Sequence, residues 1–153
     1  MDEFWHLIGR SIRTCNLNQR SQSDISHLWQ EFFKDPWDQI LQNKVNNDVY
    51  LVYTDYEGNY QAPYTVFLGY QVAHLGLVPY GLQARTFPPQ YMKKRLIKGT
   101  QPQACQKAWE EIWAEDAQLP RAYTYDFERH LLAEPAMDQY TVELFLSMKK
   151  PLP

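Results

Sequence analysis

The sequence predicts an α+β fold made of two similar halves, each with a strand, a helix and a hairpin, which form an antiparallel sheet with two main helices and a ligand cleft. Two repeated patterns indicate this fold. Leu-Trp-Gln-Glu-Phe-Phe at 28–33 is echoed by Ala-Trp-Glu-Glu-Ile-Trp at 108–113, and the Tyr-Thr-Val at 64–66 recurs at 140–142. A unit of about half a small domain cannot bury its own apolar face. The halves should therefore pack together as one effector-binding domain over 1–153, with a first repeat of about 4–73, a second of about 82–148 and a cleft between them.

The first half begins with a strand over about 4–15, where apolar residues stand among polar ones. Ser23 and Asp24 offer a helix N-cap, and the apolar residues that follow recur at helical spacing until Asp35-Pro36. Residues 48–57 and 64–73 are rich in Val and Tyr and are separated by a Gly-Asn turn, which is typical of a hairpin. The segment 74–81 contains glycines and a proline and reads as a linker.

The second half follows the same order. A strand pair is expected over 82–87 and 90–97, interrupted by two consecutive prolines. Pro102 then opens a helix, because the first helical turn needs no N–H partner. A closing hairpin is expected over 123–131 and 140–148, joined by a loop that contains Glu134-Pro135.

Composition narrows the classes of function. With 153 residues and 44% hydrophobic residues, the chain suits one cored domain, but 15% aromatic residues exceed what such a core needs, so some rings should line a pocket. A net charge of -3 argues against nucleic acid as the main partner, and the short basic run within 93–98 is expected on a solvated strand edge. Two cysteines, no signal peptide and no apolar run of membrane-spanning length favour the cytoplasm.

The chemistry most open to this chain is a carboxylate among aromatic rings, since no phosphate loop or paired-histidine metal motif is present. Strand alternation places Glu128 on the face opposite Phe127. If that face is the cleft, the site suits a large flat cation, because each ring face contributes about 0.5 to 2 kcal/mol through cation–π contact. The alternative is an exposed strand glutamate paired with Arg121 or Arg129.

Other candidates for the cleft come from the same patterns. Trp109 and Trp113 belong to the half that carries Glu128, although such helix stripes are more often core. Glu57 stands in the first half where Glu128 stands in the second, yet it directly precedes a turn and is also typical of a solvated residue. Glu143 shares a strand face with Phe145 and is a second candidate acid.

Four segments together resemble the gyrase-inhibitor-like, AraC-type effector-binding domains, and in particular their stand-alone branch, the integron-cassette-associated effector-binding proteins. The segments span nearly the whole chain in the family's order: 53–60, 64–69, 109–113 and 126–128. The resemblance implies a tandem pseudo-two-fold fold and a cleft for hydrophobic, often cationic, drug-like molecules.

The resemblance also assigns residues. It implies that Glu128 is the counter-ion and that Glu143 and Phe145 are the acid and the aromatic residue of the last strand. Tyr53, which begins the first of these segments, and Tyr91 are further aromatic candidates for the cleft. The chain departs from the family pattern in two places: basic residues follow Tyr91, and His130 stands where an aromatic residue often lies two positions after the key glutamate.

These observations predict a stand-alone protein that sequesters or senses an amphipathic cationic small molecule, without a cofactor, a metal or assigned catalytic residues. The first strand begins within a few residues of Met1, so no DNA-binding module is expected before it, and direct DNA binding is not expected. A separate DNA-binding or regulatory partner stays open. Two alternatives remain: a hydrolase of reactive drug-like compounds that uses the cleft glutamate, and a protein–protein adaptor.

Overall fold

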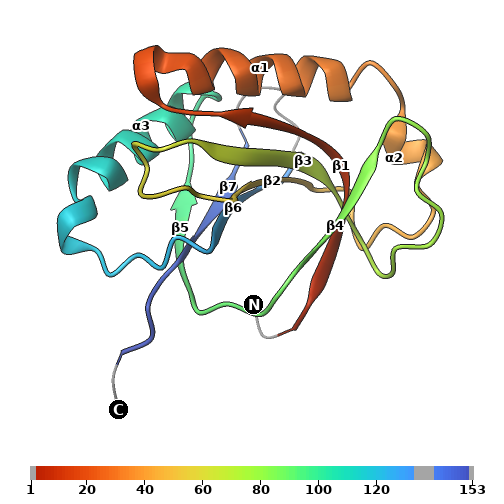
Figure 1. The fold of residues 1–153 in the computed structure, drawn as a ribbon. Helices are drawn as coiled ribbons and strands as arrows, with labels where there is room; N and C mark the ends of the chain where they lie inside the picture. Colours follow the sequence, from red (N-terminus) through yellow and green to blue (C-terminus); the bar gives the residue numbers. More distant parts are fainter. Residues whose placement is uncertain (1–2, 133–139, 152–153) are drawn as a thin grey trace.

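The computed structural model describes residues 3–132 and 140–151 and contains one seven-stranded antiparallel sheet in the order β4-β1-β3-β2-β6-β7-β5. The two long helices, α1 and α3, lie on the same side of this sheet (Figure 1). The strands are β1 Trp5–Thr14, β2 Val49–Thr54, β3 Tyr64–Val72, β4 Gln83–Phe87, β5 Met92–Ile97, β6 Tyr125–His130 and β7 Val142–Ser147. The helices are α1 Arg20–Phe32, the short α2 Trp37–Ile40 and α3 Gln103–Ala114, with single 3-10 turns at Leu17–Gln19 and Asp116–Gln118.

The sheet order confirms the predicted α+β fold and its two-fold character. Strands β1, β3 and β2 form one half of the sheet, and β5, β7 and β6 form the other half in the reverse spatial order. The two halves meet where β2 pairs with β6, with Leu51 opposite Glu128 in the register. The predicted hairpins of both halves are present as β2–β3 and β6–β7. The sheet therefore continues through both repeats, with Glu128 on the strand that joins them.

The predicted pairing of 82–87 with 90–97 is wrong. Strand β4 pairs with β1 at one edge of the sheet, whereas β5 pairs with β7 at the opposite edge. Pro88 and Pro89 explain the difference, because proline fixes its φ angle, lacks an N–H group and makes a tight hairpin here unfavourable. The chain instead crosses from one edge of the sheet to the other between the two strands (Figure 1).

Helix α1 begins at Arg20, three residues before the predicted cap at Ser23. Asp24 does not cap the helix but accepts a hydrogen bond from the Thr14 hydroxyl at the end of β1 (2.7 Å). Asp24, which the sequence pattern assigned to the start of the helix, thus connects α1 to β1 instead. The loop with Glu134 and Pro135 lies outside the described residues.

Strand alternation separates two apolar clusters on the two faces of the sheet. The helix-side cluster includes Leu51, Trp109 and Leu144, and the cluster on the other face includes Trp5, Tyr50 and Phe127. Both faces of the central strands are therefore covered, which explains why every residue of β2 is buried. The helix-side face of the sheet is accessible to solvent at the cavity between α1 and α3.

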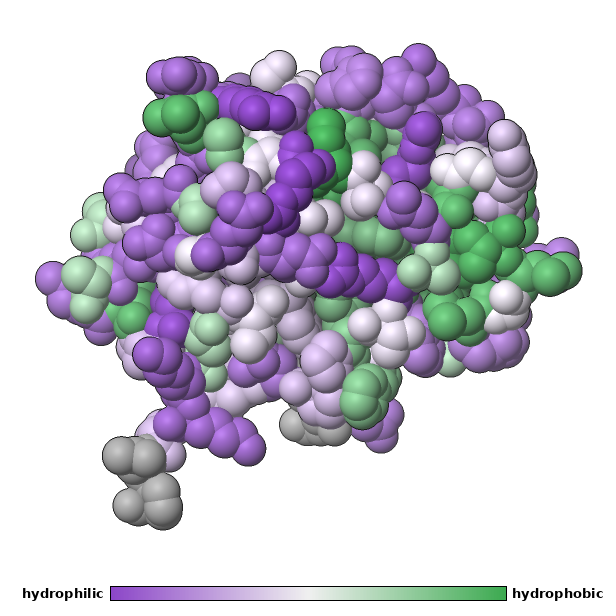
Figure 2. All heavy atoms as spheres, viewed as in Figure 1, coloured by the Kyte–Doolittle hydropathy of each residue, from purple (hydrophilic) through white to green (hydrophobic). Residues whose placement is uncertain are grey.

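Figure 2 shows a mostly polar surface with apolar side chains gathered over α2 and the segment that follows β3. The exposed large apolar residues of that segment are Leu77, Val78 and Tyr80. Within 3–132 and 140–151, none of the helices has the length and apolar character needed to cross a membrane.

Candidate ligand-binding cavity

A cavity of about 650 Å³ lies between α1, α3 and the helix-side face of the sheet. Its wall includes residues of both halves, and exposed residues such as Gln22, Ser26 and Glu110 form part of its rim. Aromatic side chains dominate the lining, namely Trp29, Tyr53, Tyr56, Tyr60, Tyr64, Trp109, Trp113 and Tyr140. A volume of this size is typical of a site for a drug-sized molecule.

Glu128 lies at the floor of the cavity with 2% of its surface exposed. Its Oε2 atom accepts hydrogen bonds from the Tyr53 hydroxyl (2.6 Å) and from the Trp109 indole N–H (2.7 Å). Its Oε1 atom lies 2.7 Å from Nε2 of His130. Tyr53 comes from β2, Trp109 from α3, and Glu128 and His130 from β6, so both halves of the molecule position the carboxylate.

These contacts keep Glu128 ionised although it is buried. Burial by itself would raise its pKa, but the hydrogen bonds from His130, Tyr53 and Trp109 and the charge interaction with His130 outweigh burial, so the pKa lies below its usual value. The pKa values of two neighbouring groups are raised instead. Burial and the Glu128 charge raise the pKa of the Tyr53 hydroxyl and of the Cys105 thiol, which therefore stay protonated.

His130 connects the carboxylate to one wall of the cavity. Its Nδ1 atom lies 2.9 Å from the Tyr140 hydroxyl, and its ring meets the Trp29 ring edge-to-face with centroids 4.9 Å apart. Since Glu128 and His130 are two residues apart on β6, strand alternation places both on the cavity face. The histidine is therefore part of the cavity wall.

Arg121, which also lines the cavity, belongs to a buried ion pair. Arg121 and Asp126 form a salt bridge of 2.6 Å, and both side chains are almost completely buried. Asp126 also accepts hydrogen bonds from the Tyr56 hydroxyl (2.5 Å) and the Ser147 backbone N–H (2.7 Å). Burial nevertheless raises the pKa of Asp126. The guanidinium group of Arg121 lies 4.2 Å from the centre of the Tyr123 ring.

Four of the eight residues expected in the cleft line the cavity: Tyr53, Trp109, Trp113 and Glu128. Trp113 stacks on Tyr60 with ring centroids 5.7 Å apart and an interplanar angle of 7°. Arg121 and Arg129, the expected alternative partners of Glu128, bind Asp126 and Asp48 instead. The alternative of an exposed, paired Glu128 is therefore wrong.

The other four lie away from the cavity, which corrects their assignment. Glu57 lies beyond the end of β2, is exposed and pairs with Arg13 (2.8 Å), because β2 ends three residues before it. Tyr91 is exposed in the connection before β5.

Glu143 and Phe145 point to the face of the sheet opposite the helices. Glu143 pairs with Lys94 (2.5 Å), and Phe145 stacks on Phe127 with centroids 4.5 Å apart. Val142 and Leu144 belong to the helix-side core, so alternation along β7 turns Glu143 and Phe145 away from the cavity.

Cys105, His130, Trp29 and Arg121 are functional candidates that sequence reasoning did not place in the cleft. For two of them a signal was present: His130 is two residues after Glu128 on the same strand, and Trp29 is the counterpart of Trp109 in the repeat. Both repeated tryptophans line the cavity. Nothing local in the sequence distinguishes Cys105 or Arg121.

Comparison with known proteins places the chain in a family. The family model of the integron-associated effector-binding proteins, Cass2, matches residues 1–147. A search of curated proteins found no match.

Three solved structures share the fold. An integron cassette protein from the mobile metagenome of Vibrio cholerae is 22% identical, with a TM-score of 0.73 and coverage of 96% of this chain and 92% of that one. SAV2435 bound to tetraphenylphosphonium is 16% identical, with a TM-score of 0.75 and coverage of 96% and 90%. A putative bacterial transcription regulation protein from Staphylococcus aureus MU50 is 15% identical, with a TM-score of 0.73 and coverage of 97% and 94%. With a family match over 147 of its 153 residues and this shared fold, the chain belongs to the integron-associated effector-binding proteins.

Proposed function

We propose that this protein binds hydrophobic cationic small molecules in the cavity between α1 and α3, with the Glu128 carboxylate as counter-ion, and thereby sequesters or senses them. The single observation that carries the proposal is a buried, ionised carboxylate at the floor of a cavity lined by eight aromatic side chains. SAV2435, a protein of similar fold whose structure was solved with tetraphenylphosphonium bound, supports the same class of ligand.

The physical reason is the cost of desolvating a charge. A ligand that fills the cavity removes the remaining water near Glu128, and a neutral ligand offers no charge to compensate for this loss. A cation compensates through Coulomb attraction that strengthens as water leaves. Ring faces such as those of Trp109 and Trp113 add cation–π attraction and apolar contact.

The first prediction tests this charge complementarity with two ligands and two variants. Tetraphenylphosphonium is the cationic ligand, and triphenylphosphine oxide is a neutral ligand of related shape. We expect Glu128→Gln to weaken tetraphenylphosphonium binding by about tenfold or more, a change of at least about 1.4 kcal/mol. The neutral ligand should bind weakly to both proteins. Isothermal titration calorimetry and quenching of tryptophan fluorescence provide the measurements.

Glu143→Gln is the matched control, because it removes the same charge from the opposite face of the sheet, where Glu143 pairs with Lys94. Its affinity for tetraphenylphosphonium should equal that of the parent protein. An equal loss in both variants would mean that general surface charge, and not the cavity carboxylate, attracts the cation. Unchanged affinity in Glu128→Gln would refute the counter-ion role.

A further inference from the structure

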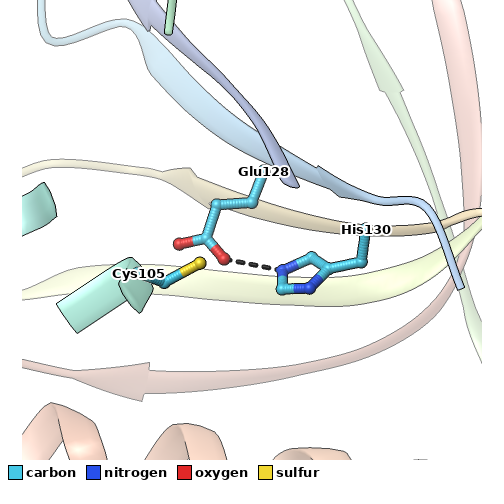
Figure 3. A group of neighbouring side chains, drawn as sticks. All are labelled: Cys105, Glu128 and His130. Carbon is cyan, nitrogen blue, oxygen red and sulfur yellow. Dashed lines mark hydrogen bonds and ion pairs between the residues drawn. The ribbon is translucent and has the colours of Figure 1, made fainter. Parts of the chain in front are cut away.

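Three side chains that could bind a metal ion lie together at the floor of the cavity. Cys105, Glu128 and His130 are all buried, and one donor atom from each lies within 4.8 Å of the other two. Figure 3 shows the Cys105 sulfur, from α3, directed toward the carboxylate and the imidazole of β6. The cluster therefore brings a thiol, a carboxylate and an imidazole together from two elements that pack against each other.

We propose that Cys105, Glu128 and His130 form a binding site for a borderline-soft divalent metal ion of the zinc class. Sulfur, nitrogen and carboxylate oxygen are the donors that Zn²⁺ takes in proteins, whereas Mg²⁺ and Ca²⁺ take oxygen donors. This inference does not depend on the proposed binding of organic cations.

The geometry is close to what the ion requires. Bond lengths of about 2.0–2.3 Å place the donors of a tetrahedral zinc site about 3.5 Å apart. The donor atoms lie within 4.8 Å of one another, so the widest separation would close by about 1.3 Å at most, and the Oε1–Nε2 pair at 2.7 Å would open by about 0.8 Å. His130 and Glu128 already lie in contact at 2.7 Å. The fourth position would face the cavity and remain open for water or another small ligand, as in zinc sites with three protein donors.

The surroundings of the three donors match those of metal ligands. The Glu128 oxygen that does not face His130 is held by Tyr53 and Trp109, and the other imidazole nitrogen of His130 contacts the Tyr140 hydroxyl. Such outer contacts orient metal ligands and fix the histidine ring. They leave Oε1 of Glu128, Nε2 of His130 and the Cys105 sulfur as neighbouring donor atoms, with the oxygen and the nitrogen hydrogen-bonded to each other while no ion is bound.

Charge also balances at this site. On binding, the Cys105 thiol loses its proton to solvent, and a sulfur–metal bond forms. The proton between Nε2 of His130 and Oε1 of Glu128 is also released, which breaks their hydrogen bond, and the neutral imidazole carries its proton on Nδ1 beside the Tyr140 hydroxyl. A thiolate, a carboxylate and a neutral imidazole then contribute two negative charges, which match a divalent ion in a buried position. The ion would neutralise Glu128, so it and an organic cation would compete for the cavity.

The test uses Co²⁺ as a spectroscopic probe of the full-length protein, followed by displacement with Zn²⁺. We expect one equivalent of Co²⁺ to produce a thiolate-to-cobalt charge-transfer band that disappears when Zn²⁺ is added. Cys15→Ser, which removes the other free cysteine, should leave the band unchanged. Cys105→Ser should abolish it, and His130→Gln should lower the affinity for Zn²⁺ by at least tenfold.

Two results would overturn the proposal: the absence of a charge-transfer band in the parent protein, or a band that persists in Cys105→Ser. Thermal melting establishes that each variant is folded. If Cys105→Ser does not fold, the parent and Cys15→Ser still decide the question, because a band in both assigns the thiolate to Cys105. Titration of the metal-free parent with tetraphenylphosphonium tests the organic-cation proposal separately. Failure to bind a metal ion can therefore be distinguished from failure to bind an organic cation.

Discussion

Glu128 and Asp126 are two acids on one strand face, yet their neighbours give them different roles. Glu128 is held by the Tyr53 hydroxyl, the Trp109 indole and the His130 imidazole, and it lines the cavity, which is the basis of its proposed role as counter-ion. Asp126 is neutralised by Arg121 and acts as a structural anchor. The difference between the two carboxylates lies in their partners, because their burial is nearly the same.

At the surface, Asp55 provides a test of charge effects at the scale of one residue. Arg85 donates hydrogen bonds to both oxygens of Asp55 (2.5 and 2.7 Å), and this contact lowers the pKa of the carboxyl group. A lowered pKa in the folded state means that the stabilisation is present above the pKa of the unfolded chain and is lost as the pH falls through the folded value.

We therefore expect Asp55→Asn to reduce the free energy of unfolding by about 0.5–1 kcal/mol at pH 7, a modest value because both side chains are partly exposed to solvent. The difference from the parent should disappear near pH 2. Urea denaturation at several pH values measures it. Asp35→Asn, at an exposed position after α1, is the control and should show a much smaller effect at pH 7. A destabilisation that persists unchanged at pH 2 would contradict the ion-pair explanation.

At the scale of elements, β1 and β3 depend on two glycines that face each other. Gly9 and Gly69 are partners in the register. A Cβ atom added at Gly9 would lie 1.8 Å from the Leu68 carbonyl oxygen, and one at Gly69 would lie 2.3 Å from the Ile8 carbonyl oxygen. Backbone atoms of paired strands cannot move aside without breaking hydrogen bonds. The close approach of these strands therefore requires both glycines.

Gly9→Ala should destabilise the protein by about 3 kcal/mol or more, at or above the upper end of the usual cost of overpacking, because the clash is with backbone. Chemical denaturation measures the change. Gly58→Ala is the control: its added Cβ meets only the Ala62 side chain, at 3.2 Å, and should change stability by less than about 1 kcal/mol. Similar effects in the two variants would show that loss of glycine flexibility, and not the contact between strands, explains the change.

At the scale of the whole molecule, polar contacts across the β2–β6 junction join the two halves. Tyr53 and Tyr56 of the first half bind Glu128 and Asp126 of the second, both through side chains on the cavity side of the sheet. The cavity is thus built at the place where the repeats are joined. Weakening the contacts across this junction should therefore destabilise both halves in a single unfolding transition.

Asp126→Asn should lower the free energy of unfolding by about 1–3 kcal/mol, because it removes the closer of the two carboxylates that pair with the buried Arg121 guanidinium, while Asp116 (3.0 Å) remains as a partner. Tryptophan fluorescence and far-UV circular dichroism should report the same, shifted unfolding transition, since tryptophans lie in both halves. Glu111→Gln, which removes an exposed ion pair with Arg95, is the control and should cost less than about 1 kcal/mol. Separate transitions in Asp126→Asn would mean that the halves unfold independently.

The sequence by itself determined the α+β class, the repeated units and the position of Glu128 opposite Phe127, because hydrophobic periodicity, turn residues and strand alternation are local properties. It also indicated Trp109 and Trp113 as part of the cleft. Alternation applied to β7 could have shown that Glu143 and Phe145 face away, had the apolar residues of that strand been assigned to the helix side.

The tertiary structure alone decided which distant residues surround the carboxylate. Cys105 and His130 are 25 positions apart, Tyr53 and Glu128 are 75 apart, and no local pattern relates them. Pro88 and Pro89 already disfavour a tight hairpin between β4 and β5, but only the tertiary structure shows that β4 pairs with β1 and β5 with β7. Local sequence sets which face a side chain occupies, whereas the packing of helices on the sheet sets which side chains meet.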